Sequence, residues 1–181
     1  FSDNGGLSTL ARPGPTCNLP LRAGKGWLYE GGIRVPMIIR APGVTEPGSV
    51  SDEPVCSMDF FPTILAAANA SRRRTHRIDG DSLLPLLTQT GELARDAIYF
   101  HYPNYAFHGD NRLGGAIRQG DFKLIERFDD GSLELYNLKD DIGETKNLAA
   151  ALTDRAAKMQ AQLQTWREET KAAMPSRSKS S

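Results

Sequence analysis

Three short clusters in this sequence combine residue types that can bind or activate a substrate. In the first, Asp3 and Asn4 place a carboxylate beside a side-chain amide, directly before Gly5 and Gly6. Hard cations such as calcium prefer oxygen ligands of these two kinds. The same letters also make an ordinary turn. Calcium takes about 6–8 oxygens, so a metal site here needs further ligands from chain outside this sequence.

The second cluster centres on Lys25, which stands between Gly24 and Gly26. Flanking glycines let the backbone approach a ligand closely, and an ammonium group binds an oxyanion as a point charge. Glu30 and Arg34 follow, four residues apart, a spacing that allows an ion pair to order the loop. The alternative is a solvated lysine in a flexible loop.

The third cluster runs from His101 to His108 and sets two histidines among aromatic residues, just after a predicted strand. This pattern is typical of a pocket wall, where a histidine of near-neutral pKa can act as an acid or a hydrogen-bond donor. The alternative for each histidine is a structural residue whose hydrogen bonds are satisfied inside the fold.

The first half of the chain reads as loops around a buried strand and two helices. Residues 5–24 are rich in Gly, Pro, Ser and Thr and predict a long functional loop. The apolar run at residues 35–40 predicts a buried strand, and residues 1–4 read as the end of another strand whose body is missing. The predicted helices run from Ser57 or Asp59 to about Ala68 and over residues 83–87.

After about residue 90 the pattern becomes that of a small sheet followed by one long helix. Four strands are expected, joined by Gly- and Asp-rich turns as an antiparallel meander, at residues 97–101, 116–119, 122–128 and 133–137. The helix opens at Asn147 or Thr153. Its apolar residues recur at steps of four and three, which predicts a packing face on the sheet made of Leu152, Ala156, Met159, Leu163 and Trp166.

Composition excludes several classes of protein. Lys plus Arg equal Asp plus Glu at 22 each, without the basic surplus of a nucleic-acid partner. No apolar run approaches the roughly 20 residues that span a bilayer. Cys17 and Cys56 can pair or stay free, and we expect free or buried thiols. We also expect a solvated surface at residues 72–74 and a disordered tail at residues 175–181.

The order of the clusters resembles the arylsulfatase-type sulfatases of the alkaline phosphatase superfamily. The likeness covers nearly the whole chain to about residue 170, and the segment from Lys25 to Pro36 is its most specific part. It rests on Asp3-Asn4, Gly24-Lys25-Gly26, Tyr29–Pro36, Asp59–Leu65, Arg118–Ile125, Glu134–Leu138 and Asp141–Leu148.

This resemblance implies roles for four residues in a sulfuric ester hydrolase. Asp3 and Asn4 would be two ligands of a calcium ion, with magnesium as the alternative. Lys25 would be catalytic and substrate-binding, holding the sulfate group and stabilising charge on the leaving oxygen. His101 falls where some family members place a substrate-pocket histidine. The expected substrate is a sulfated small molecule or sugar, and family members from bacteria are usually periplasmic or secreted.

The family's nucleophile, a formylglycine made within a Cys/Ser-x-Pro-x-Arg motif, has no counterpart in this sequence. The segment from Cys17 to Arg22 looks similar but has one residue too many before its proline. We therefore expect an α/β chain whose residues 1–88 end a sulfatase core and whose residues 89–181 form a small C-terminal subdomain. The nucleophile and the N-terminal part of the same sulfatase would lie upstream, which leaves the isolated chain inactive.

Two other readings stay open. A phosphodiesterase or phosphonate hydrolase of the same superfamily shares the metal-ligand pattern and differs in the nucleophile segment. A non-catalytic sulfatase-like fragment would keep the fold and bind without turnover.

Overall fold

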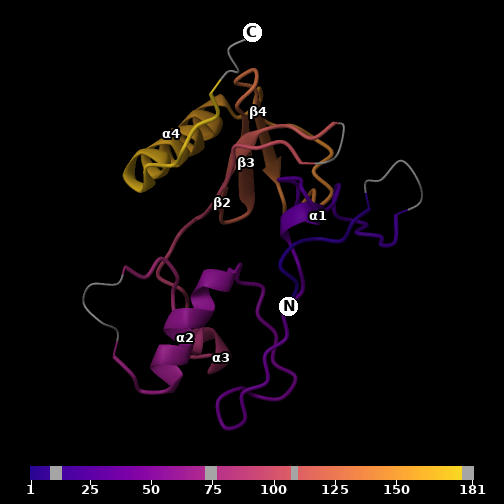
Figure 1. The fold of residues 1–181 in the computed structure, drawn as a ribbon. Coiled ribbons are helices and arrows are strands. Elements are labelled where there is room, and N and C mark those ends of the chain that lie inside the picture. The colour runs from indigo at the N-terminus through magenta and orange to yellow at the C-terminus, as the bar shows by residue number, and fades with distance from the viewer. Residues whose placement is uncertain (9–13, 72–76, 107–109, 177–181) are drawn as a thin grey trace. The chain divides into compact units, whose positions relative to one another are not determined.

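The computed structural model describes residues 1–8, 14–71, 77–106 and 110–176 (Figure 1). The arginine run at 72–74, His108 and residues 177–181 of the expected tail lie outside the described residues. Contacts divide the chain into two compact units. The sheet unit consists of Ser2–Pro36 and Ala97–Ser181, and the helical unit consists of Phe1 and Met37–Asp96.

The sheet unit is built on a four-stranded antiparallel meander in the order β1-β2-β3-β4. The β2–β3 turn is tight because Gly120 adopts a positive φ of 55°, a conformation that glycine reaches without strain. The sequence-predicted meander is therefore confirmed. The strands are β1 (Ile98–Tyr102), β2 (Gly114–Gln119), β3 (Phe122–Arg127) and β4 (Leu133–Asn137).

Helix α4 (Thr153–Thr170) covers one face of this sheet (Figure 1). Ala156, Met159 and Leu163 of the predicted apolar stripe are buried, and Trp166 packs beside them. These helix residues pack against one buried side chain from each of β2, β3 and β4, namely Ile117, Leu124 and Leu135. The helix and the part of its face from Ala156 to Trp166 are as the spacing predicted. Leu152 was wrongly included, because it precedes the helix and is 38% exposed.

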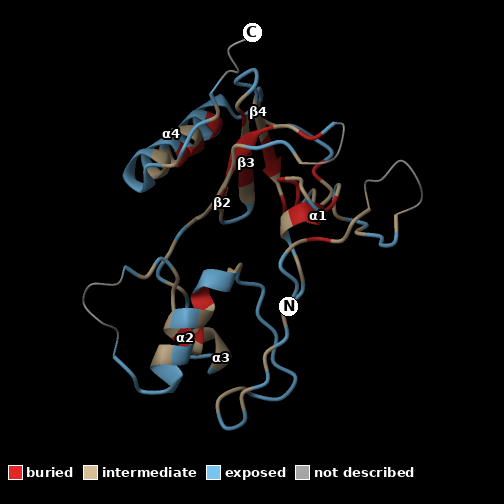
Figure 2. Ribbon diagram, viewed as in Figure 1, coloured by how far each residue is buried: buried red, intermediate tan, exposed pale blue. Residues whose placement is uncertain are grey.

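The opposite face of the sheet is covered by residues from the beginning of the chain. Helix α1 (Glu30–Ile33) follows Leu28 and Tyr29, which pack on Ala116 and Ile125 of the sheet. Figure 2 shows the buried residues gathered in the strands, α1 and the inner side of α4. Residues 2–36 thus share a core with the C-terminal sheet. This division of the chain differs from the expected one, in which residues 1–88 end the core of a longer sulfatase and residues 89–181 form a subdomain. The expected division stays a prediction.

The helical unit contains η1 (Ser57–Asp59), α2 (Phe60–Ala67) and α3 (Leu84–Leu87), as expected. Asp59 organises it, because its buried carboxylate accepts bonds from the backbones of Cys56 and Asp81 and from the Arg95 guanidinium. Among the residues of this unit that the structure describes, the buried side chains are few, namely Asp59, Thr63 and Leu83.

Two sequence expectations about strands are wrong. Residues 35–40 form no strand, and Ile38 is 91% exposed. Residues 1–4 also have no strand structure. An apolar run becomes a strand only when another strand satisfies its backbone groups, and the described strands pair within residues 98–137 alone.

Other expectations concern the cysteines and the membrane. Cys17 and Cys56 are both free thiols, so the expectation of free or buried thiols is confirmed. Among the described residues, no helix has the length and apolar character required to cross a bilayer.

Candidate functional site

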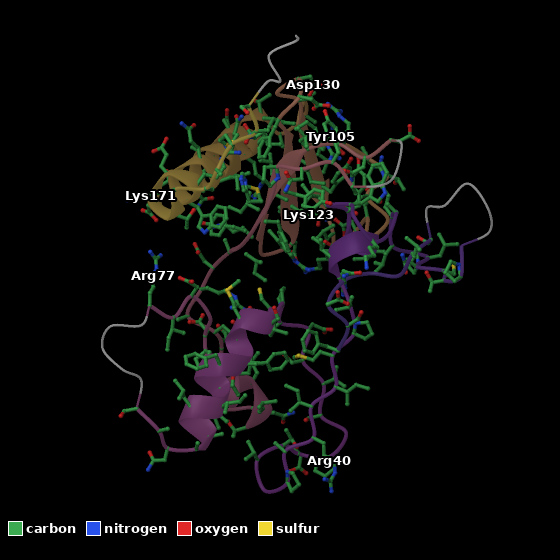
Figure 3. All side chains as sticks on the ribbon, in the orientation of Figure 1. Arg40, Arg77, Tyr105, Lys123, Asp130 and Lys171 are labelled. Carbon is green, nitrogen blue, oxygen red and sulfur yellow. The ribbon has the colours of Figure 1, made fainter. Side chains whose placement is uncertain are left out.

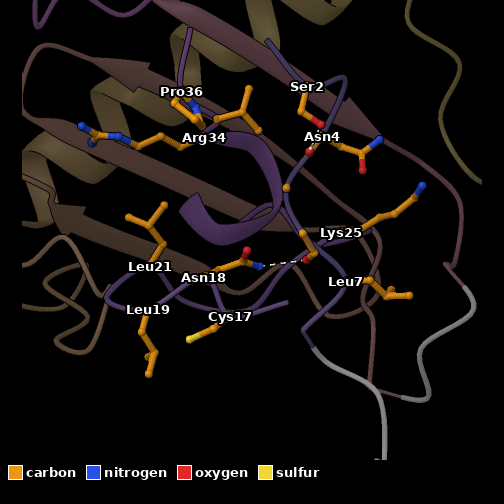
Figure 4. Close-up of a pocket in the computed structure, with 13 residues that line it drawn as sticks. Ser2, Asn4, Leu7, Cys17, Asn18, Leu19, Leu21, Lys25, Arg34 and Pro36 are labelled. Atoms are coloured by element: carbon orange, nitrogen blue, oxygen red, sulfur yellow. Dashed lines mark hydrogen bonds between the residues drawn. The ribbon is translucent and has the colours of Figure 1, made fainter. Parts of the chain in front are cut away.

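A pocket of about 510 Å³ in the sheet unit brings two predicted site residues together (Figure 4). Asn4 and Lys25 both line it. Ser2, Cys17, Asn18 and Arg34 add polar lining, and the remaining lining residues are Gly5, Gly6, Leu7, Leu19, Leu21, Val35 and Pro36. Lys25 and Arg34 give the lining two cationic side chains, and no described lining residue is an aspartate or glutamate. The pocket therefore favours an anion.

Backbone hydrogen bonds fix the first cluster against the second. The Lys25 N–H donates to the Gly6 carbonyl oxygen at 3.1 Å, and the Gly5 N–H donates to Gly32 at 2.9 Å. The chains come so close that a Cβ on Gly5 would lie 1.8 Å from the Gly31 carbonyl oxygen. Glycine at position 5 is thus a steric requirement, which explains why glycines follow the Asp3–Asn4 pair.

Asp3 and Asn4 form the expected side-by-side pair. Asn4 Nδ2 donates to Asp3 Oδ2 at 2.5 Å, and Ser2 Oγ donates to the Asn4 carbonyl at 2.8 Å. Asp3 is exposed, which leaves its carboxylate accessible to a cation. The described residues contain no group of three or more His, Cys, Asp or Glu side chains arranged to hold a metal. The pair therefore fits calcium by ligand type, and the expectation that it would supply part of a shell of about 6–8 oxygens stays a prediction.

The loop that carries Lys25 has a further anchor. Asn111, which is buried, donates from Nδ2 to the Gly26 carbonyl and accepts at Oδ1 from the Ala106 N–H at 2.8 Å. This side chain ties the connection between β1 and β2 to the residue next to Lys25. Lys25 itself is exposed at the pocket.

His101 lies elsewhere in the sheet unit and is not among the residues lining this pocket. It sits on β1 opposite Gly115, with its ring 5.4 Å from that of Phe128. Its Nε2 donates to the Ala173 carbonyl at 2.8 Å, just beyond α4. The structure therefore brings Asn4 and Lys25 together and leaves His101 apart. Its proposed substrate contact stays a prediction.

A buried ionic cluster fastens α1, and hence the Lys25 loop, to the sheet. Lys123 Nζ lies 2.9 Å from Glu30 Oε1 and 2.8 Å from Glu144 Oε1. Glu144 Oε2 also accepts from the Glu30 N–H at 2.7 Å. Arg34 lies 3.6 Å from Glu30 Oε2, so the expected Glu30–Arg34 pair is present, although Lys123 lies closer. Burial raises the pKa of Glu144, against the attraction of Lys123.

A second cluster beside it is built on the aromatic residue before α1. Tyr29 donates to Glu134 Oε2 at 2.8 Å, and Tyr136 donates to the same oxygen at 2.7 Å. Burial alone would raise the pKa of Glu134, but the bonds from Arg127, Tyr136 and Tyr29 outweigh it and lower that pKa. Arg22 lies 3.8 Å over the Tyr29 ring. Figure 3 shows Lys123 in this densely packed region between the sheet and α1.

Local sequence patterns do not identify these ion-pair partners. Glu30 and Lys123 are 93 positions apart, and a lysine within a strand reads as solvent-facing. The signal available was the position of Lys123 between the apolar residues Phe122 and Leu124, since a charge inside an apolar strand segment demands a buried counter-charge.

Comparison with known proteins identifies the family. The family model described as "N-sulphoglucosamine sulphohydrolase, C-terminal" matches residues 23–172. A sulfatase from Formosa agariphila is 37% identical over 92% of this chain and 32% of its own length. The chain thus spans about a third of the length of that relative.

Solved structures agree in fold. The crystal structure of Ps i-CgsB in complex with k-i-k-neocarrahexaose has a TM-score of 0.74 and 28% identity, covering 91% of this chain and 34% of that chain. The structure of BT4656 with its substrate D-glucosamine-2-N,6-O-disulfate has a TM-score of 0.70 and 30% identity, covering 84% and 32%. A phosphonate monoester hydrolase from Silicibacter pomeroyi has a TM-score of 0.62 and 27% identity, covering 81% and 31%. On the match over residues 23–172, the chain belongs to the sulfatase family described as N-sulphoglucosamine sulphohydrolase, C-terminal.

Proposed function

We propose that this chain contributes a sulfate-binding lysine and two calcium ligands to an enzyme that hydrolyses sulfate esters. One observation carries the proposal: Lys25 and Asn4 line one pocket and are held together by the bond from the Lys25 N–H to the Gly6 carbonyl. Membership of the sulfatase family supports the reaction class. Because the chain spans about a third of the length of the Formosa agariphila sulfatase, the activity is that of the longer protein.

The proposed chemistry uses the charge of Lys25. Its ammonium would bind an oxygen of the sulfate group and stabilise the negative charge that grows on the leaving oxygen as the S–O bond breaks. Asp3 and Asn4 would hold calcium, which when bound supplies positive charge beside the same sulfate. The described residues offer no formylglycine precursor in the required motif, so no step is assigned to that group. The isolated chain is therefore expected to be inactive.

The substrate class that we propose is a sulfated sugar. Support comes from the similarity to BT4656, whose structure holds D-glucosamine-2-N,6-O-disulfate as its substrate, and from the two cationic residues that line the pocket. An aryl sulfate uses the same lysine and differs only in the group that leaves. The N-terminal part of the same sulfatase is the proposed partner, and the periplasm or the cell exterior is the proposed location.

A titration with inorganic sulfate tests the role of Lys25. The backbone amide signals of the ¹⁵N-labelled chain are followed by NMR while sulfate is added. We expect the Lys25 and Gly26 amides to shift in a saturable way, and the shift to disappear in Lys25→Ala. Lys139→Ala removes an exposed lysine from the loop after β4 and serves as the matched control. A saturable shift that survives Lys25→Ala would overturn the proposal.

An assay of the chain with an aryl sulfate tests the expected inactivity. No turnover is expected. Turnover that is lost in Cys17→Ala would instead identify Cys17, which lines the pocket, as a nucleophile. Turnover that survives this substitution would contradict the expectation that the nucleophile lies upstream.

A phosphonate or phosphodiester substrate is the second candidate, favoured by the structural similarity to the phosphonate monoester hydrolase. The same NMR titration with methylphosphonate separates the two. Tighter binding of sulfate at Lys25 supports the sulfatase, and tighter binding of methylphosphonate supports the alternative. In the full gene product, a Cys/Ser-x-Pro-x-Arg segment upstream would favour the sulfatase.

A further inference from the structure

Asn18 stands at the meeting point of the three segments that build the pocket. Its side chain is half-buried and lines the pocket, and Figure 4 shows it below the Asn4 segment. We propose that Asn18 is a positioning residue that holds the Asp3–Asn4 segment and the Lys25 loop in register. Its importance for substrate rests on the proposed function, but its geometric role does not.

The contacts of one nitrogen carry this proposal. Asn18 Nδ2 lies 2.8 Å from the Gly6 carbonyl oxygen, 3.0 Å from that of Ala23 and 3.3 Å from that of Gly31. It also lies 2.9 Å from Ser8 Oγ. Gly6 is two residues after Asn4, Ala23 is two residues before Lys25, and Gly31 belongs to α1. The two hydrogens of this –NH₂ group are shared among these acceptors, so a single amide lies within hydrogen-bond distance of every segment whose relative position decides where Asn4 and Lys25 lie.

An amide is the group that this environment requires. The –NH₂ of asparagine carries two hydrogens and accepts no bond, so it suits a site surrounded by carbonyl oxygens. An aspartate of the same shape donates nothing and would place a negative charge among those oxygens. A hydroxyl has one hydrogen and reaches fewer partners.

Neighbouring glycines make room for this side chain. A Cβ on Gly24 would lie 2.8 Å from Asn18 Nδ2, and a Cβ on Gly6 would lie 2.7 Å from Asn18 Oδ1. Both positions are also within two residues of the site residues Lys25 and Asn4. The glycines that flank the two clusters thus serve the fit around Asn18 as well as any approach of a ligand.

The Gly6 carbonyl links Asn18 to Lys25. It accepts from Asn18 Nδ2 and from the Lys25 N–H. Without the asparagine donor, the Ser8 Oγ bond to the Ala23 carbonyl and the Gly5 N–H bond to Gly32 remain, and the Lys25 N–H bond loses the donor that shares its Gly6 acceptor. We therefore expect that bond to open more often while the sheet below it stays closed.

Amide hydrogen exchange of the full chain, read by NMR, tests the proposal. Asn18→Asp keeps the shape and removes both donors. We expect exchange at Lys25 and Gly5, whose N–H groups bridge the loops, to rise about tenfold or more. Exchange at Leu124 and Leu135, inside the sheet, should stay within about twofold of the parent.

Asn147→Asp is the matched control. Asn147 donates from Nδ2 to the Leu133 carbonyl at 3.1 Å, outside the pocket. The same substitution there loses the same kind of bond, and we expect exchange at Lys25 and Gly5 to remain unchanged. Asn18→Ser, which retains one donor, should give an intermediate rate at both amides.

Two results would overturn the proposal. One is exchange at Lys25 and Gly5 in Asn18→Asp that stays within about twofold of the parent. The other is a rise that is equal in the loops and in the sheet, which would show a general loss of stability. Sulfate titration separates this proposal from the proposed function. If the Lys25 amide signal of the parent chain does not shift when inorganic sulfate is added, the proposed function is contradicted. The exchange rates still decide the role of Asn18 in that case.

Discussion

Lys123 of β3 and Glu30 of α1 form an ion pair of 2.9 Å in which neither side chain is more than 1% exposed. Glu144 completes the site at 2.8 Å from the same ammonium. Two carboxylates around one buried lysine are tolerated because Arg118 and Arg34 approach Glu30 Oε2 at 3.5 and 3.6 Å. The pocket loop is thus joined to the sheet through a cluster whose charges depend on each other.

Lys123→Met should strongly destabilise the sheet unit. It removes the shared cation and leaves Glu30 and Glu144 facing each other in a buried site, a change that costs about 3–5 kcal/mol. Urea unfolding followed by the fluorescence of Trp27 and Trp166 measures the loss. Lys139→Met, at an exposed lysine, should change the free energy of unfolding by less than about 0.5 kcal/mol. Equal losses in the two variants would contradict the importance of the cluster.

Leu163→Ala should open a cavity between α4 and the sheet. Leu163 is fully buried, and truncating a leucine in such a place costs about 2–5 kcal/mol. Leu152→Ala, just before the helix, removes the same atoms from a residue that is 38% exposed. The control should cost clearly less in the same urea experiment. A similar cost at both positions would mean that α4 does not pack as described.

Acid should weaken the helical unit through Asp59. Burial alone would raise the pKa of this carboxyl, but the Arg95 guanidinium and the N–H groups of Cys56 and Asp81 outweigh it and lower the pKa. Because the folded-state pKa is depressed, the stabilisation is complete above the unfolded value of about 3.9. It is lost as the pH falls through the lower folded value.

NMR shifts of the Cys56 and Asp81 amides measure this titration. These two N–H groups donate to opposite oxygens of Asp59, at 2.7 and 3.0 Å. Their shifts should stay constant from neutral pH to about 4 and change below it. Asp59→Asn should abolish the change. A midpoint above about 4 would contradict the dominance of the Arg95 bonds.

Gly5→Ala should separate the two halves of the pocket. The added methyl would lie 1.8 Å from the Gly31 carbonyl oxygen, so the backbone must move. We expect faster amide exchange at Lys25 and a loss of about 1–3 kcal/mol. Gly91→Ala is the control, since its methyl would meet the Pro85 side chain at an ordinary 3.5 Å. Unchanged exchange at Lys25 would show that the segments adjust without consequence.

The regular elements were predictable because their patterns are local. Alternation and turn residues are enough to place β2, β3 and β4 within two residues, and the stripe from Ala156 to Leu163 predicts the packed face of α4. The absence of a strand at residues 35–40 was not predictable in the same way. The apolar residues of this run indicate burial, yet a strand also needs a partner that no local pattern reveals.

The candidate site was predictable in its residue types and not in its supports. Asp3, Asn4 and Lys25 stand out by their flanking glycines. Asn18 does not stand out in the sequence, because a polar residue in a loop has many possible partners. Its hydrogen bonds depend on how three segments of the chain fold against one another. The segment from Cys17 to Arg22 resembles a nucleophile motif in sequence. In the structure, Asn18 of this segment bonds to the Gly6 and Ala23 carbonyls of the segments around it.

The dependence of the Lys25 loop on distant residues has a genetic consequence. A nonsense codon just after Asp121 would leave every pocket-lining residue encoded, since the lining ends at Pro36. The product would nevertheless lack Lys123, Glu134 and Glu144, which hold α1 and Tyr29 from about 90–115 positions further along the chain. Alleles that spare the pocket in this way should behave as null alleles, indistinguishable in effect from those that delete Lys25.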